Sequence, residues 1–286
     1  MKKLLATIIS LFLILLTACS NEVADIDFMT FNTNPDIFNI SKVDLPYKLN
    51  RYCKSYSFDY SVDGVLVEGY ISIPNNSSVN TPSKCILYNR GGNCNIGFLT
   101  DTDTAKICAE TSRIVIASQY RANDEFGGED LKDVLKLIDF CESFDFADMR
   151  DFTVAGVSRG GMMSYMAARE DNRIKRIISI SGVSDLAQAY KDRDDMKKLL
   201  NNFIGGSPES KPEEYEKRSA VSWTDEITVP TLIIHSTGDQ QVSYSQAESL
   251  YEKLLENGTD VTLKTYTDST HGLHPEDLAI ITDWLE

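Results

Sequence analysis

The stretch AGVSRGG, residues 155–161, constrains this chain more than any other feature. An apolar run over residues 152–155 precedes it and predicts a strand, and the residues after it predict a helix. Gly156, Ser158 and Gly160 fit the pattern G-x-S-x-G, in which a tight turn between strand and helix exposes a serine hydroxyl. Ser158 is therefore a candidate nucleophile, although a serine in a plain glycine-rich turn would give the same pattern.

The segments around this stretch alternate between expected strands and expected helices. Residues 56–74 predict a β-hairpin that turns at Asp63-Gly64. Short β-branched runs then alternate with amphipathic segments, such as the helix expected around residues 131–138. An antiparallel hairpin followed by strand–helix units predicts an α/β fold, with a mostly parallel, doubly wound sheet and helices on both faces. In such sheets the functional side chains gather at the carboxyl ends of the strands.

A serine hydroxyl is a weak nucleophile, so it needs a base, and the base needs an orienting acid. Asp239 leaves the buried strand TLIIHSTGD, and His271 follows the last expected strand in DSTHG. These two residues succeed Ser158 in the order serine, acid, histidine, each at the end of a strand. We expect Ser158, Asp239 and His271 to form a catalytic triad.

Each partner in this triad has a competitor in the sequence. Asp268 ends the strand just before His271 and could replace Asp239 as the acid. His235 lies within a strand and is expected to be a packed side chain, whereas His274 precedes a proline at the start of the last helix. The triad order favours Asp239 and His271 and leaves the other three as alternatives.

Acyl-transfer chemistry also needs hydrogen-bond donors for an oxyanion. The backbone N–H of Arg159 is one candidate, because this residue begins the helix after the serine. Gly91, Gly92 and Asn93 follow the strand CILYN in the loop YNRGGN and are candidates for the other donors. A plain glycine turn is the alternative interpretation of this loop.

The loop YRANDEFGGED follows a strand that ends at Tyr120. Its charged residues Arg121, Asp124 and Glu125 are therefore expected to overlook the pocket, where a carboxylate could hold the amino group of a substrate. A solvated loop without a binding role is the alternative.

The first 18 residues predict an export leader. Two lysines precede a 13-residue apolar run, residues 4–16, which is too short for a permanent membrane span. The sequence LTAC at its end resembles the lipobox of bacterial lipoproteins, which implies that Cys19 is the lipid-anchored first residue of an exported protein on the bacterial cell envelope. An ordinary secretory leader with an incidental cysteine is the alternative. Residues 19–50 are polar and lack periodicity, so they predict a tether to the domain at 51–286.

Charge and cysteine spacing exclude several classes of partner. The formal net charge is −15, and removal of the leader with its two lysines brings it to −17, which disfavours nucleic acid as a partner. The five cysteines after Cys19 have no C-x-x-C spacing, so a zinc cluster is not expected, and nothing implies an organic cofactor. Because five is an odd number, at least one of these thiols stays unpaired within the chain, and most are expected to be buried and free.

Six stretches together resemble the catalytic domain of the prolyl oligopeptidase family within the α/β-hydrolases, over residues 51–286. They are SVDGVLVEGYISIP, YNRGGN, QYRANDEFGGEDLKDV, GVSRGGMMS, PTLIIHSTGDQQVSYSQAESLYEKL and THG. The resemblance implies an α/β-hydrolase fold and a serine hydrolase that acts through an acyl-enzyme on small peptides or esters, with Ser158, Asp239 and His271 as its triad. Arg90 departs from the family, which often has tyrosine or histidine there, so its role as a substrate-binding residue stays open.

Two further hypotheses use the same residues. One is a carboxylesterase or carbohydrate deacetylase with the same triad, and the other is an inert surface lipoprotein that only binds peptide or glycan. The irregular, charged segment at residues 183–228 is a candidate lid over the pocket.

Overall fold

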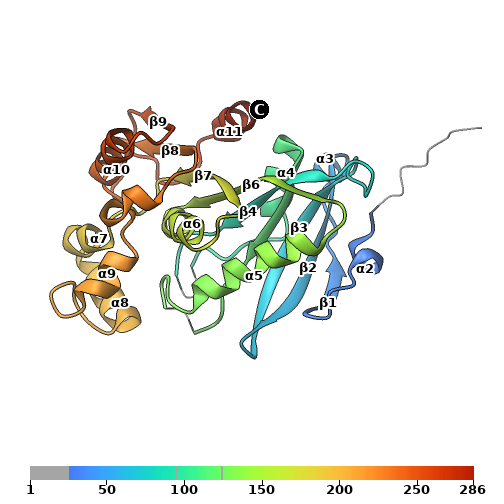
Figure 1. Cartoon of the computed structure of the whole chain (residues 1–286), viewed down its shortest axis with the longest axis horizontal. Coiled ribbons are helices and arrows are strands. Elements are labelled where there is room, and N and C mark those ends of the chain that lie inside the picture. The colour runs from blue at the N-terminus through green and yellow to red at the C-terminus, as the bar shows by residue number, and fades with distance from the viewer. Residues whose placement is uncertain (1–25, 94–95, 124) are drawn as a thin grey trace, which may run out of the picture.

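The computed structural model describes residues 26–93, 96–123 and 125–286, and within these ranges the strands form one nine-stranded sheet. The sheet order is β1-β2-β3-β5-β4-β6-β7-β8-β9 (Figure 1). Pairing is antiparallel from β1 to β5 and parallel from β5 through β4 to β9, so the predicted α/β fold is confirmed. The strands are β1 (Ile37–Lys42), β2 (Cys53–Val62), β3 (Val65–Pro74), β4 (Ser83–Asn89), β5 (Ile114–Ser118), β6 (Ala147–Val157), β7 (Ile174–Ile180), β8 (Thr231–Ser236) and β9 (Val261–Tyr266).

The predicted hairpin is formed by β2 and β3. Val62 pairs with Val65 across a two-residue loop. The loop residues Asp63 and Gly64 have φ of +52° and +79°. Two successive positive φ angles are those of a type I′ turn, whose twist matches that of the flanking strands. The dipeptide Asp63-Gly64 therefore fixes the register of the hairpin.

Helices cover both faces of the sheet. Neighbouring residues of a strand point to opposite faces, so each strand supplies apolar side chains to a core on either side. Leu87 of β4 packs into the larger core with α5 and α6, whereas Ile86 packs into a second core with α4 and α11. The second face is also lined by Ile178 and Leu232 from β7 and β8. The covering helices are α4 (Asp103–Thr111) and α11 (Asp277–Leu285) on one face, and α5 (Asp130–Ser143), α6 (Arg159–Glu170) and α10 (Tyr244–Glu256) on the other.

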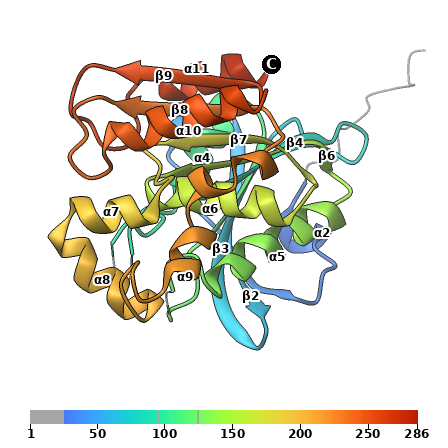
Figure 2. The same cartoon turned by 60° about the vertical axis from the view of Figure 1, so that its left-hand side comes forward.

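Residues 183–228 form a small helical cluster beside α6. It contains α7 (Leu186–Asp192), α8 (Asp194–Ile204), α9 (Pro212–Lys217) and the 3₁₀ turns η1 (Ala220–Ser222) and η2 (Thr224–Glu226). Figures 1 and 2 show α7, α8 and α9 grouped together at one side of the molecule. Leu186, Leu200 and Tyr215 are buried in the larger core, so this cluster is part of the packed domain.

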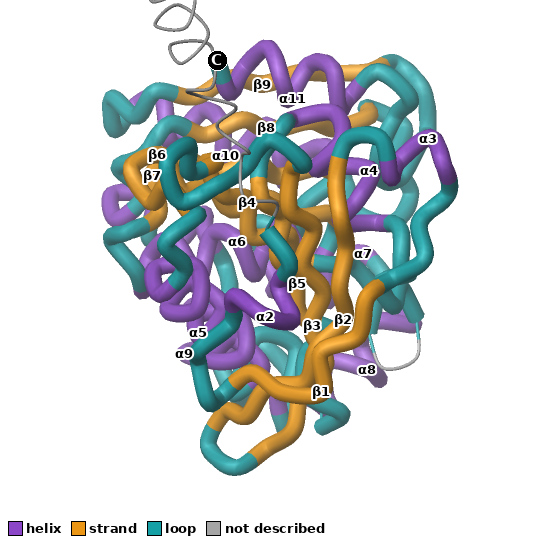
Figure 3. The backbone as a smooth tube through the Cα atoms, turned by 90° about the vertical axis from the view of Figure 1, so that its right-hand side faces the viewer, coloured by secondary structure: helices purple, strands orange, loops and turns teal. Residues whose placement is uncertain are grey.

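The structure corrects the prediction of a tether at residues 19–50 over its described part, residues 26–50. From Ile26 onward the chain packs on the domain, and the Phe28 side chain is fully buried. Residues of β1 pair with β2, for example Ile37 with Tyr60, and Figure 3 shows β1 beside β2 at the edge of the sheet. The short helices α2 (Phe28–Phe31) and α3 (Tyr47–Asn50) complete this segment. The domain therefore begins well before residue 51.

The predicted leader and Cys19 lie outside the described residues, as do Cys94 and Asp124. Across the ranges that the structure covers, no helix combines the length and apolar character that a bilayer span requires. The cysteines within those ranges are free and buried; they are Cys53, Cys85, Cys108 and Cys141.

Candidate active site

Ser158 lies at the sharp turn between β6 and α6. Its backbone has φ of +57° and ψ of −119°, a strained conformation for a residue with a side chain. The two motif glycines make the turn fit, since a Cβ on Gly156 would lie 2.2 Å from the carbonyl oxygen of Gly160. A Cβ on Gly160 would lie 2.0 Å from the carbonyl oxygen of Asn89. The pattern G-x-S-x-G is thus required by close backbone packing, and the serine is held at the carboxyl end of β6.

His271 and Asp239 form a buried pair at the same edge of the sheet. The Nδ1 atom of His271 lies 2.8 Å from Oδ2 of Asp239, and the Asp239 carboxylate is inaccessible to solvent. The backbone N–H groups of Gln241 and Val242 donate to Oδ1 of Asp239 at 2.8 and 3.1 Å.

These contacts determine the ionisation of Asp239. Burial opposes ionisation, but hydrogen bonds from His235, His271, Gln241 and Val242 outweigh it and hold the pKa of the Asp239 carboxyl below its ordinary value. The carboxylate stays charged and orients the His271 ring.

Asp268 and His274 pair with each other, whereas His235 lies on the far side of the proposed acid, with its Nε2 3.3 Å from Oδ2 of Asp239. Asp268 contacts His274, at 3.1 Å between Oδ2 and Nε2, and accepts a hydrogen bond from the backbone N–H of Thr270. His235 is fully buried, and its Nε2 lies 2.9 Å from the Val242 carbonyl oxygen. Because a carbonyl only accepts, Nε2 of His235 donates this hydrogen bond.

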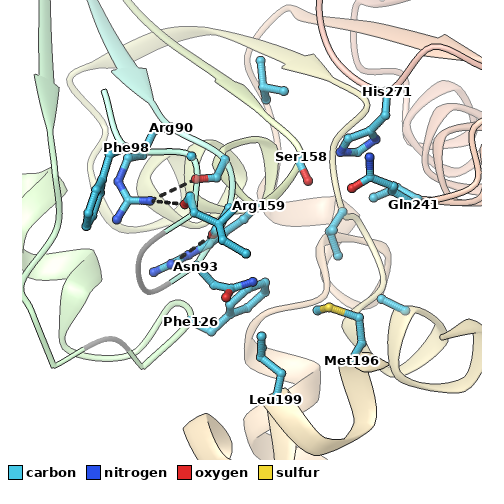
Figure 4. A pocket seen from close by; sticks show the side chains of 18 of the residues that line it. Arg90, Asn93, Phe98, Phe126, Ser158, Arg159, Met196, Leu199, Gln241 and His271 are labelled. Carbon is cyan, nitrogen blue, oxygen red and sulfur yellow. Dashed lines mark hydrogen bonds between the residues drawn. The ribbon is translucent and has the colours of Figure 1, made fainter. Parts of the chain in front are cut away.

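Ser158 and His271 line one cavity of about 590 Å³. Figure 4 shows the Ser158 hydroxyl on the side of the cavity where the His271 ring lies. Among the described residues no hydrogen bond joins the two, as is common for catalytic groups that come together only with substrate bound.

The loop after β4 presents free backbone donors to this cavity. Gly91, Gly92 and Asn93 line it, and in the described part of the chain their N–H groups donate no hydrogen bond. Gly92 has φ of +73°, and a Cβ there would lie 2.1 Å from the Ile96 carbonyl oxygen. Arg159 is the first residue of α6, so its N–H is one of the helix-start groups that have no acceptor within the helix. All four residues predicted to supply oxyanion donors thus line the same cavity as Ser158.

The prediction that Arg121 overlooks the pocket is wrong. Its side chain is buried and forms a bidentate ion pair with Asp133, whose Oδ1 lies 2.8 Å from Nη2. Glu125 also lies outside the cavity lining, since its carboxylate accepts the backbone N–H of Glu129 at 2.9 Å. Arg121 thus contacts the first turn of α5, and Glu125 contacts the residue just before that helix. The position of both residues after a strand does not indicate these contacts.

Arg90 does line the cavity, but its guanidinium donates hydrogen bonds to backbone carbonyls of the protein. Nε and Nη2 donate to the Gln119 carbonyl at 3.0 and 2.7 Å, and Nη1 donates to the carbonyls of Gly91 and Ile96. This side chain is only 3% exposed. Arg90 therefore contacts the candidate oxyanion loop through its side chain.

Sequence reasoning missed the opposite wall of the cavity. Phe126 comes from the loop before α5, and Met196 and Leu199 come from α8 (Figure 4). Gln241, two residues after Asp239, lies beside the His271 ring in the same view. The amphipathic pattern of α8 was the available signal, because its apolar residues at 196, 199, 200 and 203 lie on one face.

Comparison with protein families gives a match to the prolyl oligopeptidase family over residues 119–286. An uncharacterized peptidase of Bacillus subtilis (strain 168), YtmA, is 27% identical over an alignment of 248 positions that covers 83% of this chain and 95% of the relative. A dipeptidyl-peptidase 5 of Porphyromonas endodontalis is 23% identical over an alignment of 231 positions that covers 74% of this chain and 33% of the relative. The chain thus spans nearly all of the first relative but about a third of the second.

Solved structures share the fold. An acylaminoacyl peptidase in complex with Z-Gly-Gly-Phe-chloromethyl ketone has a TM-score of 0.71 at 19% identity, over 82% of this chain and 41% of the other. Acetyl xylan esterase 1 from Thermoanaerobacterium sp. JW/SL YS485 has a TM-score of 0.67 at 15% identity, over 88% of this chain and 87% of the other. Both identities are low, so these likenesses concern the fold alone.

Proposed function

This chain belongs to the prolyl oligopeptidase family and is a serine hydrolase, and from that premise we propose that it cleaves small peptides or esters through an acyl-enzyme on Ser158. The observation that carries the proposal is the buried pair of Asp239 and His271, 2.8 Å apart, beside a serine held at a strained turn. All three side chains reach the carboxyl edge of one sheet from three separate strand ends.

The geometry supports the following steps. The Ser158 Oγ attacks the substrate carbonyl carbon while Nε2 of His271 takes the hydroxyl proton, and Asp239 stabilises the imidazolium that forms. The carbonyl oxygen becomes an oxyanion, which accepts hydrogen bonds from the N–H groups of Arg159 and of the loop at 91–93. His271 then returns the proton to the leaving amine or alcohol. Water next attacks the acyl-enzyme while His271 takes its proton, and His271 gives that proton to the Ser158 oxygen as the acid product leaves.

The cavity wall supports a proposal for the substrate class. Phe126, Met196 and Leu199 form an apolar surface opposite the triad, which suits an apolar group next to the scissile carbonyl. Similarity to an acylaminoacyl peptidase and to dipeptidyl-peptidases supports peptide substrates.

Ester hydrolysis is the second candidate. It is supported by the fold likeness to an acetyl xylan esterase, which covers most of both chains. The triad chemistry is the same in both cases, and only the leaving group differs. If neither kind of substrate is hydrolysed, we would conclude that the protein binds peptide or glycan without catalysis.

Paired assays test the hydrolase function and distinguish a peptidase from an esterase. We expect hydrolysis of aminoacyl naphthylamides with apolar side chains, of p-nitrophenyl acetate, or of both, and the ratio of the two kcat/KM values assigns the class. Ser158→Ala and His271→Gln should each lower kcat by at least about 10³-fold. His274→Gln is the matched control from the same loop, and it should retain most activity. Equal turnover by wild type and Ser158→Ala would refute the proposal.

We propose further that the protein is exported and lipid-anchored at Cys19 in the bacterial cell envelope. The sequence LTAC after an apolar leader supports this. Fractionation of cells that express the wild type or Cys19→Ser tests it, since the variant should leave the membrane fraction. A variant that stays equally membrane-bound would refute lipidation.

A further inference from the structure

Two buried arginines flank the candidate oxyanion loop within a cluster of aromatic rings. Arg90 and Arg159 are 3% and 1% exposed. Their guanidinium carbons lie 4.8 and 4.6 Å from the centroid of the Tyr120 ring. Phe98 is 5.0 Å from the Arg90 guanidinium, and Phe126 is 4.8 Å from that of Arg159. We call these five side chains the arginine–aromatic cluster.

The two guanidiniums donate to successive carbonyl oxygens of the loop. Nη1 of Arg90 donates to the Gly91 carbonyl at 3.1 Å, and Nη1 of Arg159 donates to the Gly92 carbonyl at 3.3 Å (Figure 4). In a trans peptide the N–H points opposite to the carbonyl of the same peptide unit. The N–H groups of Gly92 and Asn93 therefore point away from the arginines. Both residues line the cavity with Ser158, and their N–H groups donate to no acceptor among the described residues.

Hydrogen bonds and an ion pair around the arginine–aromatic cluster hold the two arginines in place. Nη2 of Arg159 forms a buried ion pair with Asp130, which also accepts the backbone N–H groups of Gly127 and Gly128. The Tyr120 hydroxyl donates to the Arg90 carbonyl at 3.0 Å. Aromatic faces and a carboxylate together offset the cost of burying two cations. Such contacts hold each guanidinium in one orientation, as a positioning group requires.

We propose that the side chain of Arg159, supported by Arg90, is a positioning residue that aims the loop N–H donors at the oxyanion. This inference rests on the acyl-enzyme reaction proposed above. Arg159 then serves the site twice, because its backbone N–H is one donor and its side chain orients the others. The loop and Arg90 precede residue 119, where the family match begins.

Variants of Arg159 test the inference against a matched buried arginine. Arg113 is 5% exposed and forms an ion pair with Asp151, but it precedes β5 at the amino end of that strand, away from the cavity. Arg159→Met and Arg113→Met should both lower stability. Only Arg159→Met should lower kcat for p-nitrophenyl acetate, by about 10- to 100-fold, with KM changed less than about threefold, because the lost interaction acts in the transition state.

A second readout measures the oxyanion site directly. A trifluoromethyl ketone accepts the Ser158 oxygen at its carbonyl carbon and becomes a bound oxyanion, while His271 takes the hydroxyl proton. We expect Arg159→Met to weaken its inhibition by the same factor as kcat, and Arg159→Lys, which keeps the charge and one donor, to restore part of both. If Arg159→Met does not fold, Arg159→Lys against Arg113→Lys gives the same comparison with smaller differences.

The outcomes separate this inference from the proposed function. If Ser158→Ala is inactive while the Arg159 and Arg113 variants lose activity and inhibitor affinity equally, the positioning role is refuted and the reaction stands. A rise in KM with unchanged kcat in Arg159→Met would also refute it. Equal turnover by wild type and Ser158→Ala would overturn the reaction, and the positioning role with it.

Discussion

At the scale of single residues, the site depends on which of two acids contacts which of two histidines. Asp239 contacts His271, and Asp268 contacts His274, although the sequence allowed other pairings. Both carboxylates accept backbone N–H groups, but the Asp239 side chain is fully buried, while that of Asp268 is half-exposed.

Substitution of the two acids should therefore have unequal effects. In Asp239→Asn the amide would favour the wrong tautomer of His271, and we expect kcat to fall by about 10³- to 10⁴-fold while the fold is retained. Asp268→Asn is the control and should cost less than about tenfold, since it contacts no group of the proposed triad. Steady-state kinetics at pH 8, with circular dichroism to check folding, measures both. An Asp268→Asn variant as impaired as Asp239→Asn would contradict this division of roles.

The sequence predicted which residues lie at the functional edge of the sheet, but not the direction in which each of their side chains points. The ends of strands indicated which residues reach the functional edge, and this was enough to bring Ser158, Asp239 and His271 together. It could not show that Arg121 turns to Asp133 on α5, because that contact depends on where the helix packs. The orienting contact of the Arg159 side chain with the Gly92 carbonyl likewise joins residues that are 67 positions apart.

At the scale of elements, periodic segments were predictable and the N-terminal segment was not. Helices such as α5 and α10 carry apolar residues at helical spacing, and the hairpin carries its turn dipeptide. Residues 26–50 have neither, because they are held by isolated side chains such as Phe28 and Ile37 and by strand pairing to β2. Isolated buried side chains produce no periodic pattern of apolar residues in the sequence.

Truncation of Phe28 tests whether this segment belongs to the domain. Its ring centroid lies 5.4 to 5.9 Å from those of Tyr56, Phe58 and Phe144. We expect Phe28→Ala to lower the free energy of unfolding by about 3 to 5 kcal/mol. The control Phe38→Ala, at a half-exposed position on β1, should cost less than about 1 kcal/mol. Urea unfolding of the chain without its leader measures both, and an unchanged Phe28→Ala would support the tether instead.

At the scale of the whole molecule, a formal charge of −15 makes the paired carboxylates important for stability. Arg150 beside Asp148, and Arg218 beside Glu214, lower the pKa of each carboxyl to about 2. Backbone N–H of Thr270 lowers the pKa of Asp268 to about 2 as well. These folded-state values lie below the unfolded values near 4, so the stability they provide is present above about pH 5 and is lost as the pH falls toward 2.

The urea midpoint should therefore be nearly constant between about pH 7 and pH 5.5 and fall steeply below about pH 4. Glu214→Gln removes one of these groups, and its midpoint should fall less steeply with acid than that of the wild type. The exposed carboxylate at Glu256 provides a control, Glu256→Gln, that should leave the slope unchanged. A wild-type midpoint that is flat down to about pH 3 would contradict this account of the acid response.

Ser158 is the proposed nucleophile of this hydrolase. A fluorophosphonate probe tests this role most directly, because the serine oxygen displaces fluoride from phosphorus only where a base and an oxyanion site activate it. Intact-mass analysis and peptide mapping of the folded protein should show one adduct, on Ser158, with His274→Gln labelled at the wild-type rate and His271→Gln labelled far more slowly. No adduct on the wild type, or equal labelling of Ser158→Ala, would contradict the claim.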